Sequence, residues 1–355
     1  MTKSPSTRSP LLAQIGRNVD RIVSLDFPSY GVIGPLFEGA VKLQGEAICM
    51  QAAERLAQAV EPGGTVVLVT GLILPGHHPH GETDGPVGTA VLARTIAMAW
   101  KVRVLVVVEP ELTGLMTMLL RVAELQLVSP EALRQEDGDH RPVAAVVGLS
   151  RDRDEAFADA DGWLFDYKAN AVVAIEKAGA NAKGVYHMVG GADISAGSGK
   201  GEALFEAAAK RGLLRIGVGD RGNELGMGPI AAVARALLPF GTDCGCPCHG
   251  GVADQTDADL AVPAVVSNWG AYGIAACIAA IQERQELLHT AERERRLLEA
   301  AVQHGGVDGM SGRALLAVDG IGLASGMAFV EMLTEIYRAQ SVRDPSPFST
   351  PLIKK

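Results

Sequence analysis

The chain has 355 residues, of which 48% are hydrophobic and 21% charged, a composition that excludes disorder along its whole length. The formal net charge of −9 provides no global basic field, so we expect no nucleic-acid partner. No apolar run reaches the roughly 18–20 residues that a spanning helix needs, so we expect no membrane association. Five cysteines and no recognisable signal peptide favour a reducing, cytoplasmic compartment.

Helical periodicity and continuous apolar runs alternate along most of the chain. The pattern predicts helices at 36–60, 87–100, 111–126, 200–211, from 269 onward and at 324–339. It predicts buried strands at 65–74, 102–108, 143–149, 162–167, 171–176, 213–219 and 261–267, and a loop with a hairpin at 304–322. Continuous Val and Leu strands linked by helices are typical of a largely parallel sheet covered on both faces.

We therefore expect a three-layer α/β/α fold, with one domain over residues 21–340. Residues 1–20 are predicted to be a disordered N-terminal tail, although their Ser, Thr, Arg and Lys content also resembles a transit peptide. Residues 341–355, rich in Pro and Ser, are predicted to be a disordered tail as well. The charged stretch 283–302 favours a solvated face or a subunit contact, and we expect a homo-oligomer.

Acidic residues gather in glycine-rich loops that follow predicted strands. Glu82 and Asp84 lie in GETDGP, and Asp220 and Glu224 lie in GDRGNELGMG beside Asn223. Ligands of open α/β sheets bind at the carboxyl ends of the strands, and carboxylate oxygens suit Mg²⁺ or Mn²⁺. The sequence thus predicts a divalent-metal site, while a plain turn-forming role stays open for any single one of these residues.

Three further motifs have less specific interpretations. Cys244-Gly-Cys246-Pro-Cys248-His249 looks like a metal knuckle, but its spacing departs from that of usual zinc sites, so ordinary buried or loop cysteines are favoured. Histidines at 77, 78 and 80 precede the GETDGP acids and are either ligands, proton shuttles or exposed loop residues. GVGDRG at 217–222 matches a dinucleotide fingerprint, but its acids would repel a pyrophosphate.

Six segments carry a resemblance to a known family: 70–93, 172–179, 191–195, 204–230, 262–276 and 307–312. With the runs GETDGP, GDRGNELGMG and VSNWGAY, they are similar to the D-glutamate cyclase-like proteins over most of residues 35–337. The resemblance implies a hydro-lyase that interconverts D-glutamate and 5-oxo-D-proline, a small-molecule substrate and a divalent ion of the manganese kind. Some relatives look like metal-dependent phosphatases.

The resemblance also implies roles for matching positions. The implied metal ligands are Glu82, Asp84, Asp193, Asp220 and Glu224. The implied catalytic residues are Glu82, Asp84, Asn223, Glu224 and Asn268, and His187 is added as a candidate to move protons. The implied substrate-binding residues are Ser267 and Trp269, and we add His80, Thr83 and Lys183 as candidate substrate contacts.

One segment departs from the family pattern. Relatives carry Asp-Gly-x-Tyr-x-Asn-Met-Arg-Gly where this chain has KGVYHMVGG at 183–191, so an acid has become Lys183, an amide His187 and an arginine Val189. An arginine there could hold a substrate carboxylate bidentately, so a different lactam or cyclic amide stays open as the substrate. Two alternatives remain: a manganese-dependent phosphatase, with Lys183, Lys200 or Arg221 on the phosphate, and a non-catalytic small-molecule sensor.

Overall fold

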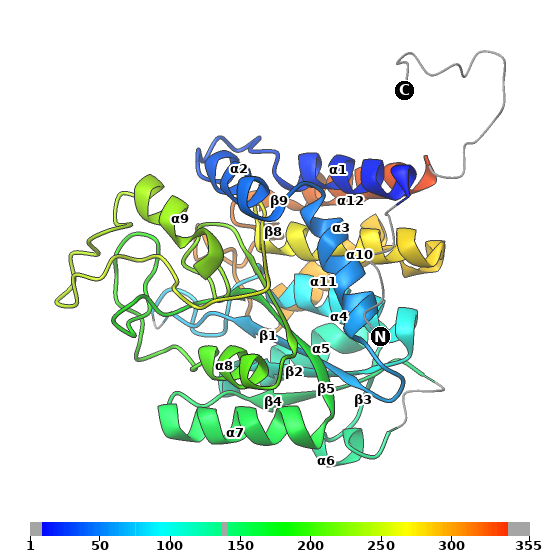
Figure 1. Ribbon diagram of the computed structural model, residues 1–355, viewed down its shortest axis with the longest axis horizontal. Coiled ribbons are helices and arrows are strands. Elements are labelled where there is room, and N and C mark those ends of the chain that lie inside the picture. Colours follow the sequence, from blue (N-terminus) through cyan, green and yellow to red (C-terminus); the bar gives the residue numbers. More distant parts are fainter. Residues whose placement is uncertain (1–8, 75, 137–140, 340–355) are drawn as a thin grey trace.

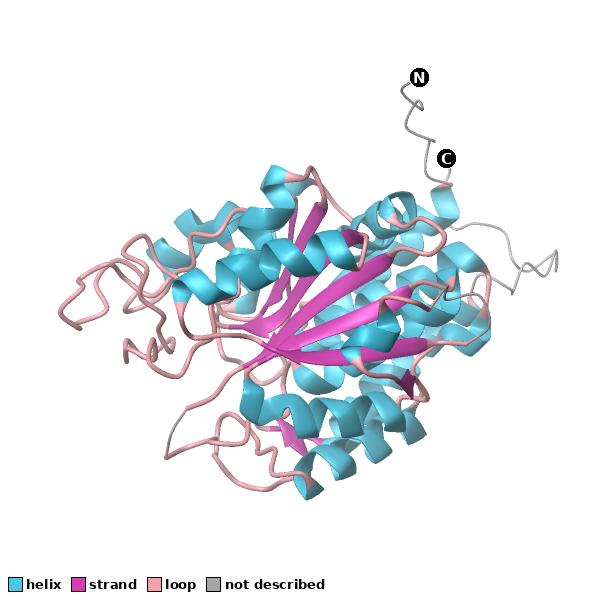
Figure 2. Cartoon of the chain, turned by 90° about the horizontal axis from the view of Figure 1, so that it is seen from below, coloured by secondary structure: helices cyan, strands magenta, loops and turns pink. Residues whose placement is uncertain are grey.

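Seven parallel strands form one sheet with helices on both faces in the computed structural model of the protein (Figure 1 and Figure 2). The structure describes residues 9–74, 76–136 and 141–339. Neighbouring strands follow the order β3-β4-β2-β1-β5-β6-β7. The predicted three-layer α/β/α fold with a parallel sheet is therefore confirmed.

The strands of the sheet are β1 (Thr65–Gly71), β2 (Arg103–Val108), β3 (Gln126–Leu127), β4 (Val143–Gly148), β5 (Ala169–Lys177), β6 (Leu214–Gly219) and β7 (Leu260–Pro263). A separate antiparallel hairpin consists of β8 (Ala317–Val318) and β9 (Ile321–Gly322). The helices are α1 (Pro10–Val23), α2 (Ile33–Gln44), α3 (Ile48–Ala59), α4 (Pro86–Trp100), α5 (Thr113–Val122), α6 (Pro130–Leu133), α7 (Arg153–Asp166), α8 (Glu202–Lys210), α9 (Ala231–Leu237), α10 (Ser267–Gln282), α11 (Ala291–Gln303) and α12 (Leu323–Arg338).

Alternate residues of each central strand enter two separate cores. In β1, Val66 and Leu68 pack with the layer that contains α1, α3, α4 and α10, whereas Val67 and Val69 pack with α7 and α8. Figure 1 shows α7 and α8 on one side of the strands and α1, α3, α10 and α12 on the other. Because both faces of the strands are covered, their sequences read as continuous apolar runs rather than alternating ones.

Two predicted elements differ from the structure. The single helix expected at 36–60 is two helices, α2 and α3, because Gly45 between them adopts a φ of 86° that ends the first. The strand expected at 162–167 lies almost entirely in α7, which Asp152 caps and which buries Ala156, Ala160 and Leu164 along one stripe. That stripe consists mostly of alanine, so its amphipathic signal in the sequence is weak.

The chain termini were both predicted to be disordered tails. Residues 10–20 instead belong to α1, which begins with a Ser9 cap and a proline and buries Val19 and Val23 in the core. The expected tail at 341–355 and residues 1–8 lie outside the described residues. None of the helices within the described ranges is long and apolar enough to cross a bilayer.

The strand order of the sheet changes direction at β1. From β1 the chain moves through β2, β3 and β4, which all lie on one side of β1, and it then returns to β5 on the other side of β1. The connections that follow β1 and β5 therefore diverge, and open α/β sheets bind ligands at such a switch point. The loops after β1, β5 and β6 all begin at this edge of the sheet.

Candidate metal and active site

Six carboxylates converge above the carboxyl ends of β1, β5 and β6. They are Glu82 and Asp84 in the loop after β1, Glu176 near the end of β5, Asp220 and Glu224 after β6, and Asp319 in the β8–β9 turn. Ligand oxygens of Asp84, Asp220 and Asp319 lie within 4.8 Å of one another, and so do those of Glu176, Asp220 and Glu224. Asp220 belongs to both groups and so connects them.

The N-terminus of α10 orients Asp84. The carboxylate of Asp84 accepts backbone hydrogen bonds from Ser267 at 2.9 Å and from Asn268 at 2.7 Å, which are the first two residues of that helix. The unpaired backbone N–H groups and the dipole of a helix N-terminus favour a negative charge there. Helix α10 therefore orients Asp84 and favours its ionised form, whereas burial and the neighbouring acids Asp319 and Asp220 oppose ionisation and raise its pKa.

The side chain of Asn268 holds the loop that carries Asp84. Its Oδ1 accepts hydrogen bonds from the backbone of Gly85 at 2.9 Å and of Gly88 at 2.6 Å, and its Nδ2 donates to the carbonyl oxygen of Thr83 at 2.9 Å. The Thr83 hydroxyl in turn donates to the carbonyl oxygen of Ala317 at 2.7 Å. Asn268 and Thr83 thus join the loop to α10 and to the hairpin, and their polar groups are engaged by the backbone.

Ser267 connects α10 to the β5 side of the site. Its Oγ donates to Glu176 Oε2 at 2.6 Å. Glu176 has a φ of 45°, an unusual backbone conformation for a residue with a side chain, directly where β5 approaches the site. A Cβ on Gly85, which has a φ of 87°, would come within 2.7 Å of the Glu176 Cβ, so the loop can pass only as glycine.

The side chain of Arg221 lies against the carboxylates. Arg221 Nε donates to Asp220 at 3.1 Å and its Nη2 to Asp319 at 3.0 Å. The hydrogen-bond partner of the third nitrogen, Nη1, among the described residues is the Met310 sulfur at 3.9 Å, and the guanidinium lies 5.6 Å from the centre of the Tyr30 ring. The carboxylate of Glu224 accepts backbone N–H groups of the same loop, from Arg221 at 3.1 Å and Gly222 at 2.8 Å. The loop after β6 therefore folds around its own acids.

Burial and mutual repulsion raise the carboxyl pKa values. Desolvation raises the pKa of Asp220 to about 8 and that of Asp319 to about 7. The pKa values of Glu82, Asp84, Glu176 and Glu224 are also raised, first by burial. Conversely, Asp220 raises the pKa of Arg221. Six acids beside the Arg221 guanidinium leave an excess of negative charge that a bound cation would neutralise.

Unpartnered oxygens support a divalent cation in this position. Among the described residues, Glu82 Oε1, Asn223 Oδ1 and Thr70 Oγ1 are buried at the site without a hydrogen-bond partner. Buried polar atoms normally have partners, and carboxylate and amide oxygens are the donors that Mg²⁺ and Mn²⁺ prefer. The residues present therefore fit the implied metal, with Asp84, Asp220, Glu224, Glu176 and Asp319 as its nearest candidate ligands.

The structure places several other expected site residues outside the carboxylate cluster. His187 is buried with its Nε2 3.3 Å from the sulfur of Cys246. Asp193 is exposed, and the hydroxyl and backbone of Ser195 hold its pKa below the usual value. Lys183 is exposed, with its stem beside Gly250. Lys183 and His187 belong to the departing family segment 183–191, and His187 meets a cysteine there, whereas Asp193 lies in the matching segment 191–195.

Two expected substrate contacts also lie apart from the carboxylates. His80 is exposed in the loop after β1, where its side chain packs near Gly305. Trp269 stacks on Phe329 with ring centroids 3.8 Å apart and on Phe27 at 5.8 Å, so its ring packs α10 against α12 and the segment after α1. Asn223 stays at the site, where its Nδ2 donates to the carbonyl oxygen of His187 at 3.0 Å.

Three residues of the cluster fall outside the site expected from the sequence. Glu176 is the last residue of the predicted strand 171–176 and has no expected role, and Arg221 has one only in the phosphatase alternative. Asp319 carried no signal, because it reaches the site from a hairpin nearly one hundred residues beyond Asp220. A search for acids in every predicted turn near the family segment 307–312 could have suggested it.

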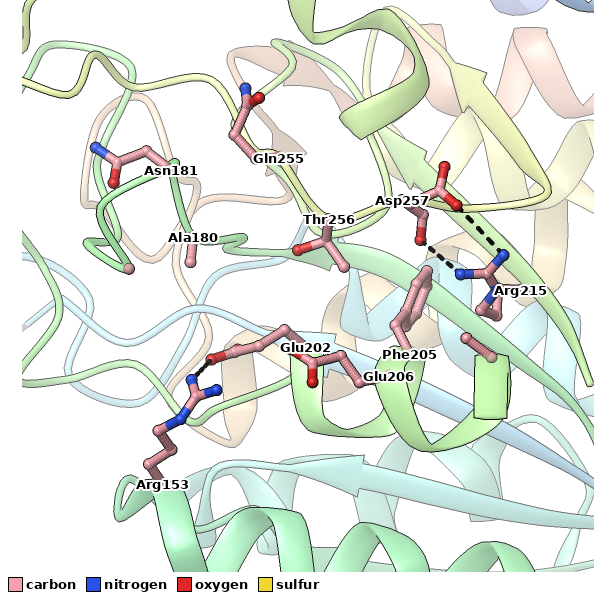
Figure 3. Close-up of a pocket in the computed structure, with 12 residues that line it drawn as sticks. Arg153, Ala180, Asn181, Glu202, Phe205, Glu206, Arg215, Gln255, Thr256 and Asp257 are labelled. Atoms are coloured by element: carbon pink, nitrogen blue, oxygen red, sulfur yellow. Dashed lines mark hydrogen bonds and ion pairs between the residues drawn. The ribbon is translucent and has the colours of Figure 1, made fainter. Parts of the chain in front are cut away.

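A surface cavity of ≈ 320 Å³ lies apart from the carboxylates (Figure 3). Both arginines of its lining are paired with acids of the same lining: Arg153 with Glu202 at 3.7 Å and Arg215 with Asp257 at 3.5 Å. Because these cations are already neutralised, the cavity presents no free positive charge among its lining residues to recognise an anionic ligand.

Comparisons with known proteins identify the family of the chain. A family described as "D-glutamate cyclase-like, C-terminal" matches residues 35–334, so the chain belongs to the D-glutamate cyclase-like family. The human protein named D-glutamate cyclase, mitochondrial, is 27% identical over an alignment of 321 residues, and the match covers 83% of this chain and 49% of that protein. The chain thus spans about half the length of this relative, and the matched region contains all six carboxylates.

Proposed function

We propose that the protein is a divalent-metal-dependent hydro-lyase that interconverts D-glutamate and 5-oxo-D-proline. The observation that carries the proposal is the buried carboxylate cluster at the switch point of the sheet, in a chain of the D-glutamate cyclase-like family. A divalent cation held by these oxygens would polarise the carbonyl group that reacts. Mn²⁺ or Mg²⁺ suits the all-oxygen donor set.

Cyclisation joins the two ends of one substrate molecule. The amine nitrogen attacks the γ-carboxyl carbon, a C–N bond forms, and one carboxyl oxygen leaves as water after it gains protons. The reverse reaction adds water to the lactam carbonyl. A side chain at the site must therefore take a proton from the nitrogen and deliver one to the leaving oxygen. Glu82, which keeps one buried oxygen without a partner among the described residues, is the residue to which we assign this transfer.

The substrate must also be held by its remaining carboxylate. Arg221 directs two nitrogens to Asp220 and Asp319, and its Nη1 meets a thioether sulfur, which is a weak hydrogen-bond acceptor. A substrate carboxylate would replace Met310 at that nitrogen and gain a charge-assisted hydrogen bond. Arg221 would therefore bind the substrate carboxylate in place of the arginine that relatives carry at the position of Val189. This role favours an acidic substrate over a neutral lactam.

A turnover assay with purified full-length chain tests the proposal. With Mn²⁺ added, the protein should interconvert D-glutamate and 5-oxo-D-proline, and a chelator should abolish the activity. Asp220→Asn should lower turnover at least about 100-fold, because it removes the carboxylate shared by both ligand groups. Asp159→Asn, the same acid-to-amide change on the exposed face of α7, should leave turnover unchanged.

Other substrates in the same assay decide between this reaction and its alternatives. Phosphate-ester hydrolysis without lactam turnover would contradict the proposal and favour a phosphatase, although Lys183 and the Lys200 ammonium, which lies over the Tyr186 ring, are not among the cluster's contacts. Turnover of neutral lactams alone would contradict the role of Arg221. Ligand binding without any turnover would favour a sensor.

A further inference from the structure

A second group of metal-ligand atoms lies outside the carboxylate cluster. His187, Cys244, Cys246 and Cys248 bring one nitrogen and three sulfurs within 4.8 Å of one another. The sulfur of Cys244 is 3.2 Å from that of Cys246 and 3.3 Å from that of Cys248. His187 Nε2 is 3.3 Å from Cys246 Sγ and 3.7 Å from Cys248 Sγ. His187 comes from a loop that is remote in sequence.

These separations approach the edges of a tetrahedron around zinc. Zn–S bonds of about 2.3 Å and Zn–N bonds of about 2.0–2.1 Å give ligand-to-ligand distances of about 3.6–3.8 Å. The four separations given above, 3.2–3.7 Å, lie at or slightly below these values, and all of the ligand atoms lie within 4.8 Å of one another. Three thiolates and one imidazole form a ligand set that closed structural zinc sites use, whereas Mg²⁺ and Mn²⁺ prefer oxygen. Four ligands this close leave no room for the several atoms of an iron–sulfur cluster.

The backbone around the sulfurs is arranged as a metal knuckle. The N–H groups of Cys248 and Gly250 point at the sulfurs of Cys246 and Cys248, at 3.4 Å and 3.3 Å. Asn181 Nδ2 lies 3.4 Å from Cys248 Sγ as well. Such donors stabilise thiolates and fix their direction, as the groups around bound metals do. The adjacent His249 instead faces Asp243 at 3.1 Å and is exposed.

We propose that His187, Cys244, Cys246 and Cys248 bind one structural zinc ion. The ion joins the loop after β5 to the segment between α9 and β7, and binding releases the thiol protons to solvent. All four positions are filled by the protein, so the site has no open place for a substrate. His249 is excluded as a ligand, although the sequence places it directly after the cysteines.

The zinc site supports the carboxylate cluster through one hydrogen bond. The carbonyl oxygen of His187 accepts the Nδ2 of Asn223, which lies in the loop that carries Asp220 and Glu224. Fixing the His187 ring thus fixes the backbone against which Asn223 is oriented. His187 is therefore a positioning residue for the site rather than a catalytic residue, and this part of the inference rests on the proposed function, whereas zinc binding itself does not.

Metal analysis of the untagged full-length protein, purified under reducing conditions without added metal, tests the inference. We expect one zinc per chain, and a mercurial that titrates the thiols should release it in step with the loss of three thiolates. Cobalt substituted for zinc should give the intense thiolate-to-cobalt absorption of a tetrahedral site. Absence of zinc, iron in its place, or a disulfide between Cys244 and Cys246 would each overturn the assignment.

Paired variants identify the ligands. His187→Ala should lower zinc content and change the cobalt spectrum, whereas His249→Ala should leave both unchanged, and equal effects of the two would contradict the inference. Asp220→Asn should keep one zinc per chain even when lactam turnover is lost, so failure of the zinc site and failure of the proposed function are distinguishable. The mercurial titration uses the unaltered protein and does not depend on whether a variant folds.

Discussion

Metal-free protein should lose stability as the pH rises from about 5 to about 7, because buried carboxyl groups hold protons that the unfolded chain releases. The pKa of Asp220 is raised to about 8 and that of Asp319 to about 7, from an ordinary value of 3.8. Between the ordinary and the raised values the folded state binds more protons than the unfolded one. Raising the pH within this window therefore favours unfolding.

The size of the effect follows from the number of protons held. One extra proton in the folded state changes the free energy of unfolding by about 1.4 kcal/mol per pH unit. If Asp220 and Asp319 together keep one proton, the loss between pH 5 and pH 7 is about 2.7 kcal/mol, which lowers Tm by several degrees. A divalent cation replaces the proton, so the pH dependence should flatten and the cation should stabilise more at pH 7 than at pH 5.

Thermal unfolding of the wild type and of Asp319→Asn, at several pH values with and without Mn²⁺, measures this effect. The amide that replaces the Asp319 carboxyl group holds no titrating proton, so the metal-free variant should show a shallower decline than the wild type. The other titrating groups, the cysteines included, are common to both proteins and cancel in the comparison. Identical slopes in the two metal-free proteins, or a wild-type stability that rises relative to the variant, would refute the reasoning.

Two substitutions probe the shape of the carboxylate site. Gly309→Ala places a Cβ against Glu82 Oε2 and should weaken Mn²⁺ binding at least about 10-fold, as measured by calorimetry. The control Gly322→Ala, whose added Cβ meets nothing within 4 Å, should leave the Mn²⁺ affinity unchanged. Equal affinities of the two variants would show that the backbone at Gly309 does not confine the site. Ser267→Ala removes the 2.6 Å hydrogen bond to Glu176 and should lower turnover about 10- to 100-fold at unchanged Tm, and wild-type turnover would show that Glu176 needs no such partner.

The layered fold follows from local sequence signals. Central strands such as β1 have both faces covered, so their Val and Leu runs are unbroken, and these runs predict a parallel sheet. Glu82, Asp84, Asp220 and Glu224 could be placed together because each follows a predicted strand, and parallel strands end at one edge. Both inferences need only the order of elements along the chain.

Contacts between loops distant in sequence could not be predicted in this way. Asp319 reaches the cluster through a hairpin whose position no spacing encodes, and His187 meets the cysteines across some sixty residues. Asn268 and Trp269 lie in a family motif that suggests a cleft. In the structure, Asn268 instead hydrogen-bonds to the backbone of Thr83, and Trp269 packs against Phe329 in the core. The type of a polar or aromatic residue indicates which interactions its side chain can make, but not which residue becomes its partner in the fold.

Isotope labelling during lactam hydrolysis tests the central claim most directly. The protein with Mn²⁺ would be incubated with 5-oxo-D-proline in H₂¹⁸O, and the glutamate formed would be examined by mass spectrometry. We predict one ¹⁸O atom per molecule in the γ-carboxylate from the wild type, and no labelled glutamate from Asp220→Asn. Absence of labelled glutamate from the wild type, or equal labelling by Asp220→Asn, would contradict hydro-lyase chemistry at the carboxylate cluster.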